Sequence, residues 1–460
     1  MLELLDILRK SNEYDSIISN LIDDHAQLNI SGLGGSALAY FLGALVEDMT
    51  DKTFLIVTET QDDMEKLARD LTTFRGEEGI VLFPPWQTFL HGGASPAREI
   101  LADRMWTLER LTYRQRSIVI TSIRALLHKI LPIETFREAT LHFIKGEEIE
   151  LGKVSQLLTH SKYERVDMVE MKGDFSIRGG IIDVYPLSYE MPVRIELFGD
   201  EIDSIRYFDP INQRSTTQIE KEVRVVPMSE IILTPEMMAY WKEKTQEIIE
   251  LQQSPKLTNE IDLLTGKLVE YGSFDGIEGY LPLLYPNLAK LWDYLPNDTI
   301  VIADDPQWLK AEAGKLIEQA DQFFEHEQEK NKLVVSHSEM FASFNEVTSF
   351  CESKKALYLS HGKNLHGRNE AESYNLGMKT HEGLRGNFQM FLKEMESWTN
   401  DGYSVNIFSD NDKQAERMRD ILIERELTSV SVHTGSIDTG FIADNLMLVI
   451  TSEDEMFGRY

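Results

Sequence analysis

The sequence predicts an α/β protein in which a parallel-sheet domain is split by a small antiparallel β-rich insertion and followed by a second α/β domain. Three observations predict this architecture. Continuous apolar runs such as 54–57 and 118–121 alternate with segments of helical periodicity, which is typical of a doubly wound parallel sheet. Two hairpin patterns follow one another between residues 163 and 208. Alternation of strands and helices resumes after residue 333.

The individual elements are predicted from the period of the apolar residues. The first part is expected to hold helices at 1–25, 64–71, 100–111 and 125–130, and strands at 27–30, 54–57, 81–84 and 118–121. A linker at 132–152 leads into the insertion. A strand at 223–233, helices at 239–252, 257–271 and 311–332, and a strand at 299–303 follow it. The last part is expected to hold strands at 333–335, 356–359, 405–408 and 446–450, and helices at 384–395 and 415–422.

The insertion has the clearest local pattern. Apolar and polar residues alternate on both sides of Gly179-Gly180 and again on both sides of Gly199-Asp200, which predicts two hairpins with one apolar and one polar face. Four arginines fall in these strands or beside them: Arg165, Arg178, Arg194 and Arg206. Arginines gathered in an acidic chain indicate a docking surface, because the guanidinium group pairs bidentately with carboxylates.

Composition limits the class of protein. The chain has 460 residues, 42% of them hydrophobic and 27% charged, which suffices for three or four globular domains. A formal net charge of −31 argues against the whole chain being a nucleic-acid-binding body, although a local basic patch stays possible. One cysteine, Cys351, excludes a disulfide framework and fits a reducing compartment. Without a signal peptide or a long apolar run, we expect a cytoplasmic protein that does not contact membranes.

A glycine-rich turn follows the first predicted strand and leads into a helix, which is the layout of a phosphate-binding loop. Its residues are Gly32, Gly34, Gly35, Ser36, Ala37 and Leu38. A working loop needs Lys for the phosphates and Ser or Thr for Mg²⁺, but Ala37 and Leu38 occupy these two positions. No Lys or Arg occurs between Lys10 and Lys52. We therefore expect a degenerate loop that is kept for packing.

A second feature of nucleotide sites is the apolar run 299–303, which ends in Asp304 and Asp305 like a Walker B strand. Here the second acid is Asp rather than Glu, Pro306 follows, and the partner lysine is missing. Acids at this edge of a parallel sheet are also common helix N-caps. We expect a cap or a vestigial Walker B rather than catalysis. We also expect no metal site, because His361, His366 and His381 lack the spacing of metal ligands.

Four stretches of the insertion carry a family resemblance: 163–165, 173–179, 185–186 and 194–202. They resemble domain 2 of the UvrB excinuclease subunit. With Gly180, Asp183 and Tyr185-Pro186, the insertion resembles more closely the UvrB-like N-terminal part of the bacterial transcription-repair coupling factor, in its low-GC Gram-positive form. The resemblance implies that the first domain is RecA-like, that 276–280 and 291–296 close it, and that the insertion binds UvrA.

The resemblance also implies domain boundaries and further partners. The expected domains are 1–135 and 215–332 for the split first domain, 136–214 for the UvrA-binding insertion, 333–455 for the second α/β domain, and 456–460 for the start of a linker. The chain is then an N-terminal fragment. ATP and Mg²⁺ are expected only in missing motor domains, which with other missing domains would engage RNA polymerase and double-stranded DNA. Intramolecular contacts with the motor and the C-terminal domain are expected as well.

Residues that bind UvrA are carried over from the resemblance: Arg165, Arg178, Arg194, Phe175, Tyr185, Glu196 and Phe198. No catalytic residue is expected in the chain.

Two alternatives to a silent adaptor stay open. The first is a UvrB-like, ATP-dependent, DNA damage-binding helicase subunit, against which the degenerate loop argues. The stretch 85–99 also argues against it, because it is too short for the DNA-clamping hairpin of UvrB. The aromatic residues Phe83, Trp86 and Phe89 are expected to pack rather than to contact bases. The second alternative is a structural role in restraining a motor.

Overall fold

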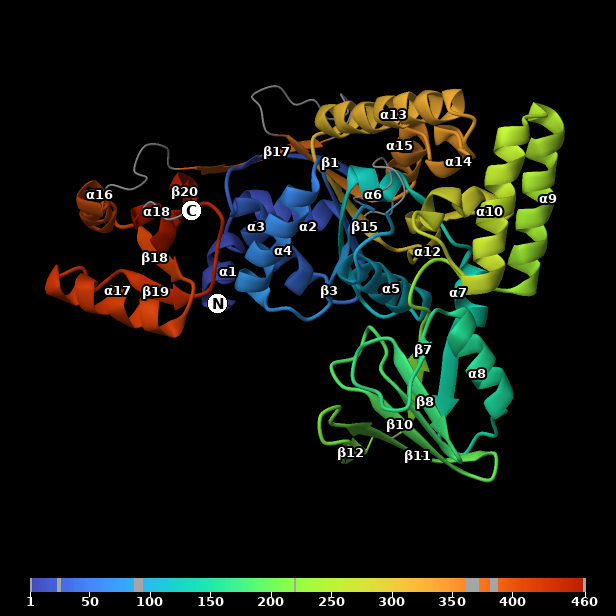
Figure 1. Ribbon diagram of the computed structural model, residues 1–460. Coiled ribbons are helices and arrows are strands. Elements are labelled where there is room, and N and C mark those ends of the chain that lie inside the picture. Colours follow the sequence, from blue (N-terminus) through green and yellow to red (C-terminus); the bar gives the residue numbers. More distant parts are fainter. Residues whose placement is uncertain are drawn as a thin grey trace.

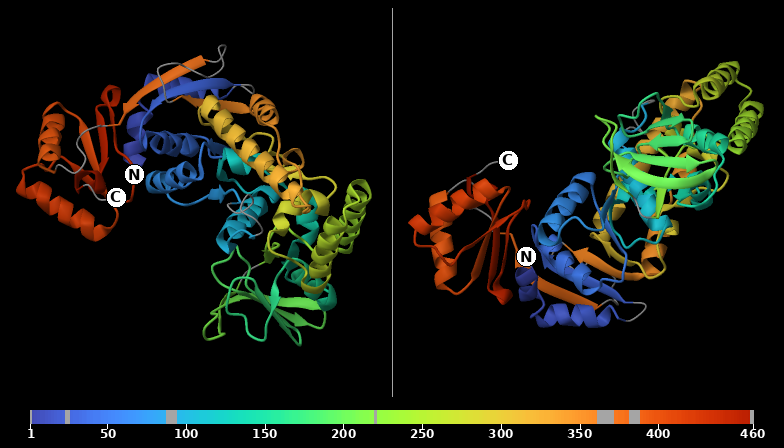
Figure 2. Two further views of the ribbon diagram at one scale, coloured as in Figure 1. Left: turned by 45° about the horizontal axis from the view of Figure 1, so that its top comes forward. Right: turned by 90° about the horizontal axis from the view of Figure 1, so that it is seen from below.

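The computed structural model describes residues 2–22, 26–86, 94–218, 221–360, 372–380 and 388–457. One large sheet and one small sheet organise the chain. In Figure 1 the large sheet and its helices form the upper body, and the small sheet lies below it on the right. The C-terminal residues form a unit at the left, and Figure 2 shows that this unit and the small sheet lie at opposite ends of the molecule.

The large sheet has eleven strands in the order β19-β18-β21-β20-β17-β1-β16-β15-β2-β4-β3. Their bounds are β1 Gln27–Leu33, β2 Phe54–Thr58, β3 Ile80–Phe83, β4 Ile118–Ser122, β15 Ile300–Ala303, β16 Lys355–Ser360, β17 Glu372–Lys379, β18 Ser404–Ser409, β19 Ser431–Thr434, β20 Phe441–Ala443 and β21 Leu448–Ser452. β20 runs antiparallel to both of its neighbours, β17 and β21. The other pairs are parallel, so the α/β class with a mainly parallel sheet is confirmed.

Helices cover this sheet on both faces, as expected when buried apolar strands alternate with amphipathic segments. In the first part they are α1 Leu2–Leu8, α2 Asn12–Asn20, α3 Ala37–Asp48, α4 Gln61–Arg75, α5 Arg98–Thr112, α6 Ile123–Leu127 and α7 Ile133–Ala139. After the insertion come α9 Pro235–Gln252, α10 Pro255–Tyr271, the 3-10 helix Ile277–Tyr280, α11 Leu281–Leu284, α12 Leu291–Tyr294, α13 Pro306–Glu329, α14 His337–Met340 and α15 Phe344–Glu352. The C-terminal unit adds α16 Phe388–Asn400, α17 Asp412–Glu424, the 3-10 helix Asp444–Leu446 and α18 Glu453–Phe457.

The strand predicted at 356–359 lies inside the first sheet. β16 pairs in parallel with β1 on one side and with β15 on the other. The large sheet therefore continues across the predicted boundary at residue 333. The part of the chain that leads from the centre of this sheet towards the C-terminal unit begins with β17. The sequence could not place this boundary because buried apolar strands resemble one another. The sequence of such a strand does not specify which strands pair with it. The strand predicted at 333–335 does not form: Leu333 packs in the core, and its N–H donates to Glu260.

The inserted domain contains a six-stranded sheet in the order β12-β11-β10-β9-β8-β7. Its strands are β7 Glu164–Arg165, β8 Asp174–Arg178, β9 Ile181–Val184, β10 Val193–Phe198, β11 Glu201–Phe208 and β12 Ser215–Gln218. Both predicted hairpins are confirmed, because β8 pairs antiparallel with β9, and β10 with β11. The predicted linker forms α7, β6 (Leu141–Ile144) and the start of α8 (Leu151–His160).

The inserted domain also extends past its predicted end at 214. β13 (Glu222–Val225) returns to pair antiparallel with β6, and Val223 and Val225 are buried in the core of the small sheet. A second small pair, β5 (Lys129–Ile130) with β14 (Ala289–Lys290), joins the two halves of the first domain across the insertion.

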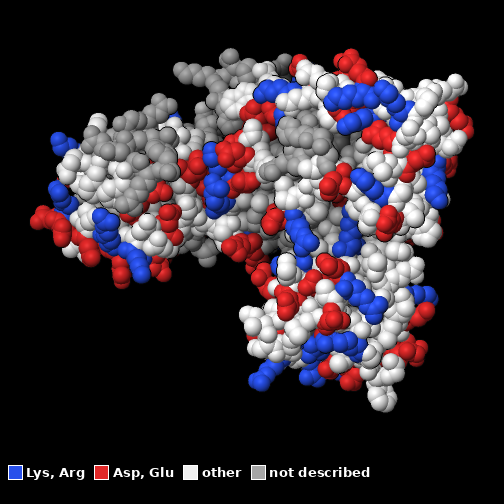
Figure 3. Space-filling view, viewed as in Figure 1, with Lys and Arg blue, Asp and Glu red and all other residues white. Residues whose placement is uncertain are grey.

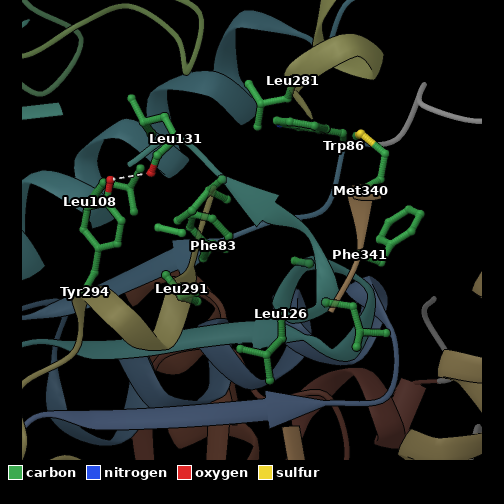
Figure 4. Close-up of a cluster of buried hydrophobic side chains, with 14 of the residues drawn as sticks. Phe83, Trp86, Leu108, Leu126, Leu131, Leu281, Leu291, Tyr294, Met340 and Phe341 are labelled. Carbon is green, nitrogen blue, oxygen red and sulfur yellow. Dashed lines mark hydrogen bonds between the residues drawn. The ribbon is translucent and has the colours of Figure 1, made fainter. Parts of the chain in front are cut away.

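The largest core lies under the helices of the first domain, and Figure 4 shows part of it. Phe83 and Trp86 are buried there, at 0% and 4% exposure, so the packing predicted for both is confirmed; Phe89 lies outside the described residues. The hydroxyl of Tyr294 donates to the carbonyl of Leu131 at 3.0 Å, which satisfies a buried polar group inside the cluster.

Candidate interaction surface and glycine-rich loop

The small sheet has an inner and an outer face. On β10, Val193, Ile195 and Leu197 face the core formed with α8, so Arg194, Glu196 and Phe198 face outward. Lateral pairing extends the outer face across the sheet, because Arg194 lies opposite Asp183 of β9 on one side and Arg206 of β11 on the other. Figure 3 shows Lys and Arg interspersed with Asp and Glu over the visible side of this domain.

Asp183 is the centre of this outer face. Its carboxylate is 1% exposed and accepts hydrogen bonds from Arg194 Nε at 2.7 Å and Nη2 at 2.9 Å. The Arg194 guanidinium also lies over the ring of Phe208, 4.6 Å from its centroid, and donates to the carbonyl of Gln213. The hydrogen bonds that Arg194 donates to Asp183 raise the pKa of Arg194. Arg178 approaches the same carboxylate at 3.3 Å, but its side chain remains 56% exposed.

The structure places the seven predicted contact residues in different environments. Phe175 is fully buried in the inner core, and Arg194 lies on the outer face but is held by Asp183 with a side chain only 16% exposed. Phe198 of β10 is 84% exposed, and Arg178 of β8 is exposed on the same outer face, with β9 between the two strands. Tyr185 is half-buried, and its hydroxyl donates to the carbonyl of Glu190.

The other two predicted residues lie at opposite places on the sheet. Glu196 is on the outer face and accepts from the hydroxyl of Ser204 at 2.6 Å, with Arg206 at 3.9 Å. Arg165 is exposed on the edge strand β7, in register with Phe175. Because residues in register point to the same side of a sheet, Arg165 belongs to the inner side and Arg178 to the outer side.

Sequence reasoning missed several exposed apolar residues of the inserted domain. Ile211 is 92% exposed in the turn after β11, Met171 is 61% exposed before β8, and Met168 and Ile181 are exposed as well. Ile181 directly follows the Gly179-Gly180 turn, so the hairpin pattern already placed it at a tip. The turn at Ile211 is set by Asp209, whose carboxylate accepts the Ile211 N–H.

The glycine-rich loop lies between β1 and α3, as predicted. Gly32 and Gly35 have positive φ angles of 72° and 60°, which a residue with a Cβ adopts only under strain. The loop's backbone amides are used within the chain: Gly34 N–H donates to Met378 O at 3.1 Å, and Ser36 N–H donates to Thr439 O at 2.8 Å. Ala37 and Leu38 begin α3, and Ala37 is fully buried.

The two acids after β15 lie at the start of α13. Asp305 is 2% exposed and is the N-cap of this helix, because its carboxylate accepts the Gln307 N–H at 2.9 Å. Asp304 accepts the Asp305 N–H at 2.8 Å. Within the described ranges, no group of three or more His, Cys, Asp or Glu is placed to hold a metal ion. His361, His366 and His381 lie outside these ranges.

Comparison with known proteins connects this surface to a family. The family model described as UvrB interaction domain matches residues 141–230, which spans β6 to β13 and every strand of the small sheet. The inserted domain is therefore similar to the UvrB interaction domain. The chain is also similar to the transcription-repair-coupling factor of Bacillus subtilis, with 27% identity over 98% of this chain. The factor from Staphylococcus aureus strain MRSA252 is 25% identical over 99% of it.

The residues matched by the family model cover the same part of the chain as the inserted domain in the structure. Both include β6 and β13, which the predicted bounds of 136–214 divided between domains. The similarity to the coupling factors covers nearly the whole chain, and the chain spans about 40% of the length of these relatives. None of the helices in the described part is both long and apolar enough to cross a membrane.

Proposed function

We propose that this chain is the N-terminal region of a transcription-repair coupling factor and that its UvrB interaction domain recruits UvrA. In the longer protein, this recruitment would bring nucleotide excision repair to a stalled RNA polymerase in the cytoplasm. The observation that carries the proposal is the outer face of the domain that matches the UvrB interaction domain, where Arg178 of β8 and Phe198 of β10 are both exposed.

The outer face has the composition of a protein-binding site. Aromatic side chains and arginines contribute most of the energy in typical interfaces, and their neighbours mainly exclude water. Phe198 supplies an apolar anchor that water surrounds in the free chain, and Arg178 supplies a charge held in place by buried Asp183. Glu196 and Tyr185 form the partly exposed surroundings. Arg165 would contact the same partner only if UvrA wraps around the β7 edge of the sheet.

We further propose that the first domain is RecA-like but catalytically silent. Two observations support this: Ala37 and Leu38 stand where Lys and Ser or Thr would be needed, and Asp305 is used as a helix cap. ATP and Mg²⁺ would then act only in motor domains found in the rest of the longer protein. Double-stranded DNA and RNA polymerase would be engaged by those other parts, which would also contact this region.

Calorimetric titration of the 460-residue chain with UvrA tests the proposal. We expect Arg178→Ala to weaken binding because losing one charged interface pair typically costs about 2–5 kcal/mol. Phe198→Ser should weaken it as well, because losing an aromatic hot spot typically costs at least about 2 kcal/mol. Either loss corresponds to at least roughly thirtyfold in affinity. Lys153→Ala is the matched control. Lys153 is 75% exposed on α8, which covers the inner face, so its removal should leave the affinity unchanged.

Each outcome of this titration discriminates between functions. Unchanged binding by both outer-face variants would contradict the assigned surface while leaving UvrA as the partner. If the wild-type chain does not bind UvrA but binds ATP–Mg²⁺, the helicase alternative is favoured instead. If it binds neither, the restraining role remains as the better account.

A further inference from the structure

Residues 435–441, which connect β19 to β20 and include the first residue of β20, cross over the glycine-rich loop. Ser36 and Thr439 form a reciprocal pair: Ser36 N–H donates to Thr439 O at 2.8 Å, and Thr439 N–H donates to Ser36 Oγ at 3.2 Å. This peptide segment thus uses both the amide at the start of α3 and the side chain of Ser36, the N-cap residue of that helix. These are the groups that a phosphate would use in a nucleotide-binding loop.

Helix α4 holds the same segment from a second side. The carboxylate of Asp70, which is 5% exposed, accepts the Asp438 N–H at 2.9 Å. The hydroxyl of Thr73 donates to Ser436 O at 2.6 Å. Asp70 and Thr73 lie about one helical turn apart, so they present one acceptor and one donor to successive peptide units of the segment.

Apolar contacts and a third hydrogen-bonding element complete the cradle. Ile437 and Phe441 are 5% and 0% exposed, and the ring of Phe441 lies 5.5 Å from that of Tyr40 in α3. On the side of the C-terminal unit, the buried carboxylate of Glu455 accepts the Gly440 N–H at 2.9 Å. The segment is therefore bound at both its polar backbone and its apolar side chains.

Gly35 is required by this contact. A Cβ at this position would lie 2.7 Å from Thr439 O and 2.9 Å from Gly440 O, distances that real Cβ atoms do not adopt. A glycine in a phosphate-binding loop allows the ligand to approach the backbone closely. Here the molecule that approaches is the chain's own peptide.

We propose that the glycine-rich loop, together with the first turn of α3 and the face of α4 that carries Asp70 and Thr73, is a docking site for the peptide segment 435–441. The segment fixes the C-terminal unit to the N-terminal half of the sheet. The strands alone join them weakly, since β17 and β20 share two residue pairs, Met378 with Ala443 and Lys379 with Ile442. This inference does not depend on UvrA binding.

Hydrogen exchange in the 460-residue chain tests the docking site, with Gly35→Ala as the main variant. We expect the amides of Asp438 and Thr439 to exchange at least roughly tenfold faster in this variant, because the added Cβ displaces the segment from their acceptors, Asp70 and Ser36. Gly76→Ala is the control: its φ of 86° is also positive, but no atom lies within 4 Å of the added Cβ. Equal exchange of these amides in both variants would overturn the proposal.

Two further measurements keep the test decisive. If Gly35→Ala also accelerates exchange in β2 and β4, the variant has disturbed the sheet. Thr73→Val then serves as the test variant instead of Gly35→Ala. This substitution keeps the shape of the side chain and removes only the donor to Ser436 O, so faster exchange confined to 435–441 is again expected. ATP–Mg²⁺ added to the wild-type chain should leave these amides unchanged. Faster exchange on its addition would mean that nucleotide competes for the loop, against the proposal.

Discussion

Removal of Arg194 should destabilise the inserted domain from within its sheet. Arg194 and Asp183 lie directly opposite each other on β10 and β9, joined by two hydrogen bonds at 2.7 and 2.9 Å. In Arg194→Ala, a carboxylate that is 1% exposed loses its main partner. Breaking a buried ion pair by removing one partner typically costs about 3–5 kcal/mol. Arg178, 3.3 Å from the same carboxylate, retains part of the interaction, so we expect about 2–4 kcal/mol.

Hydrogen exchange of the β9 and β10 amides measures this cost within the domain. A loss of about 2–4 kcal/mol corresponds to exchange roughly thirty to several hundred times faster. Arg178→Ala is the matched control, because it removes the other cation of Asp183 from an exposed position and should cost less than about 1 kcal/mol. If Arg194→Ala exchanges no faster than Arg178→Ala, the view of Arg194 as an internal support is wrong, and the residue is available to a partner after all.

Three other predictions concern separate parts of the chain. Arg104→Ala should lower the unfolding free energy by about 3–5 kcal/mol, because it leaves the fully buried Glu230 without its partner at 2.6 Å. Urea unfolding followed by tryptophan fluorescence measures this, and an unchanged midpoint would contradict it. Burial raises the pKa of Asp70 to about 6. The folded chain therefore keeps a proton that the unfolded chain releases near pH 4, so this group lowers stability as pH rises from 4 to 6. Asp70→Asn should remove that fall from a series of urea midpoints, and a parallel pH profile would refute the assignment. Phe198→Ser should change the unfolding free energy by less than about 0.5 kcal/mol, since the side chain is 84% exposed, so any larger loss would show that its role is structural.

The sequence by itself determined the elements whose signals are local. Both hairpins form at their glycine-containing turns, because the turn type and the period of two are encoded in neighbouring residues. The glycine turn between β1 and α3 was readable for the same reason, as was the absence of a lysine from it. The acidic cap of α13 was readable as one of two alternatives, and the hydrogen bond from Gln307 to Asp305 is that of a cap.

Only the tertiary structure decided which distant residues meet. β16 lies between β1 and β15 because buried apolar strands are interchangeable in sequence and are ordered by the packing of the whole sheet. The arginines of the inserted domain cannot be told apart from the sequence. In the structure, Arg194 is held by the buried carboxylate of Asp183 and stabilises the sheet, whereas Arg178 remains exposed. The glycine-rich loop shows the same limit. The glycines in its local sequence indicate that another group approaches the loop backbone closely. Only the tertiary structure shows that this group is the peptide at Thr439, about 400 residues away in the chain.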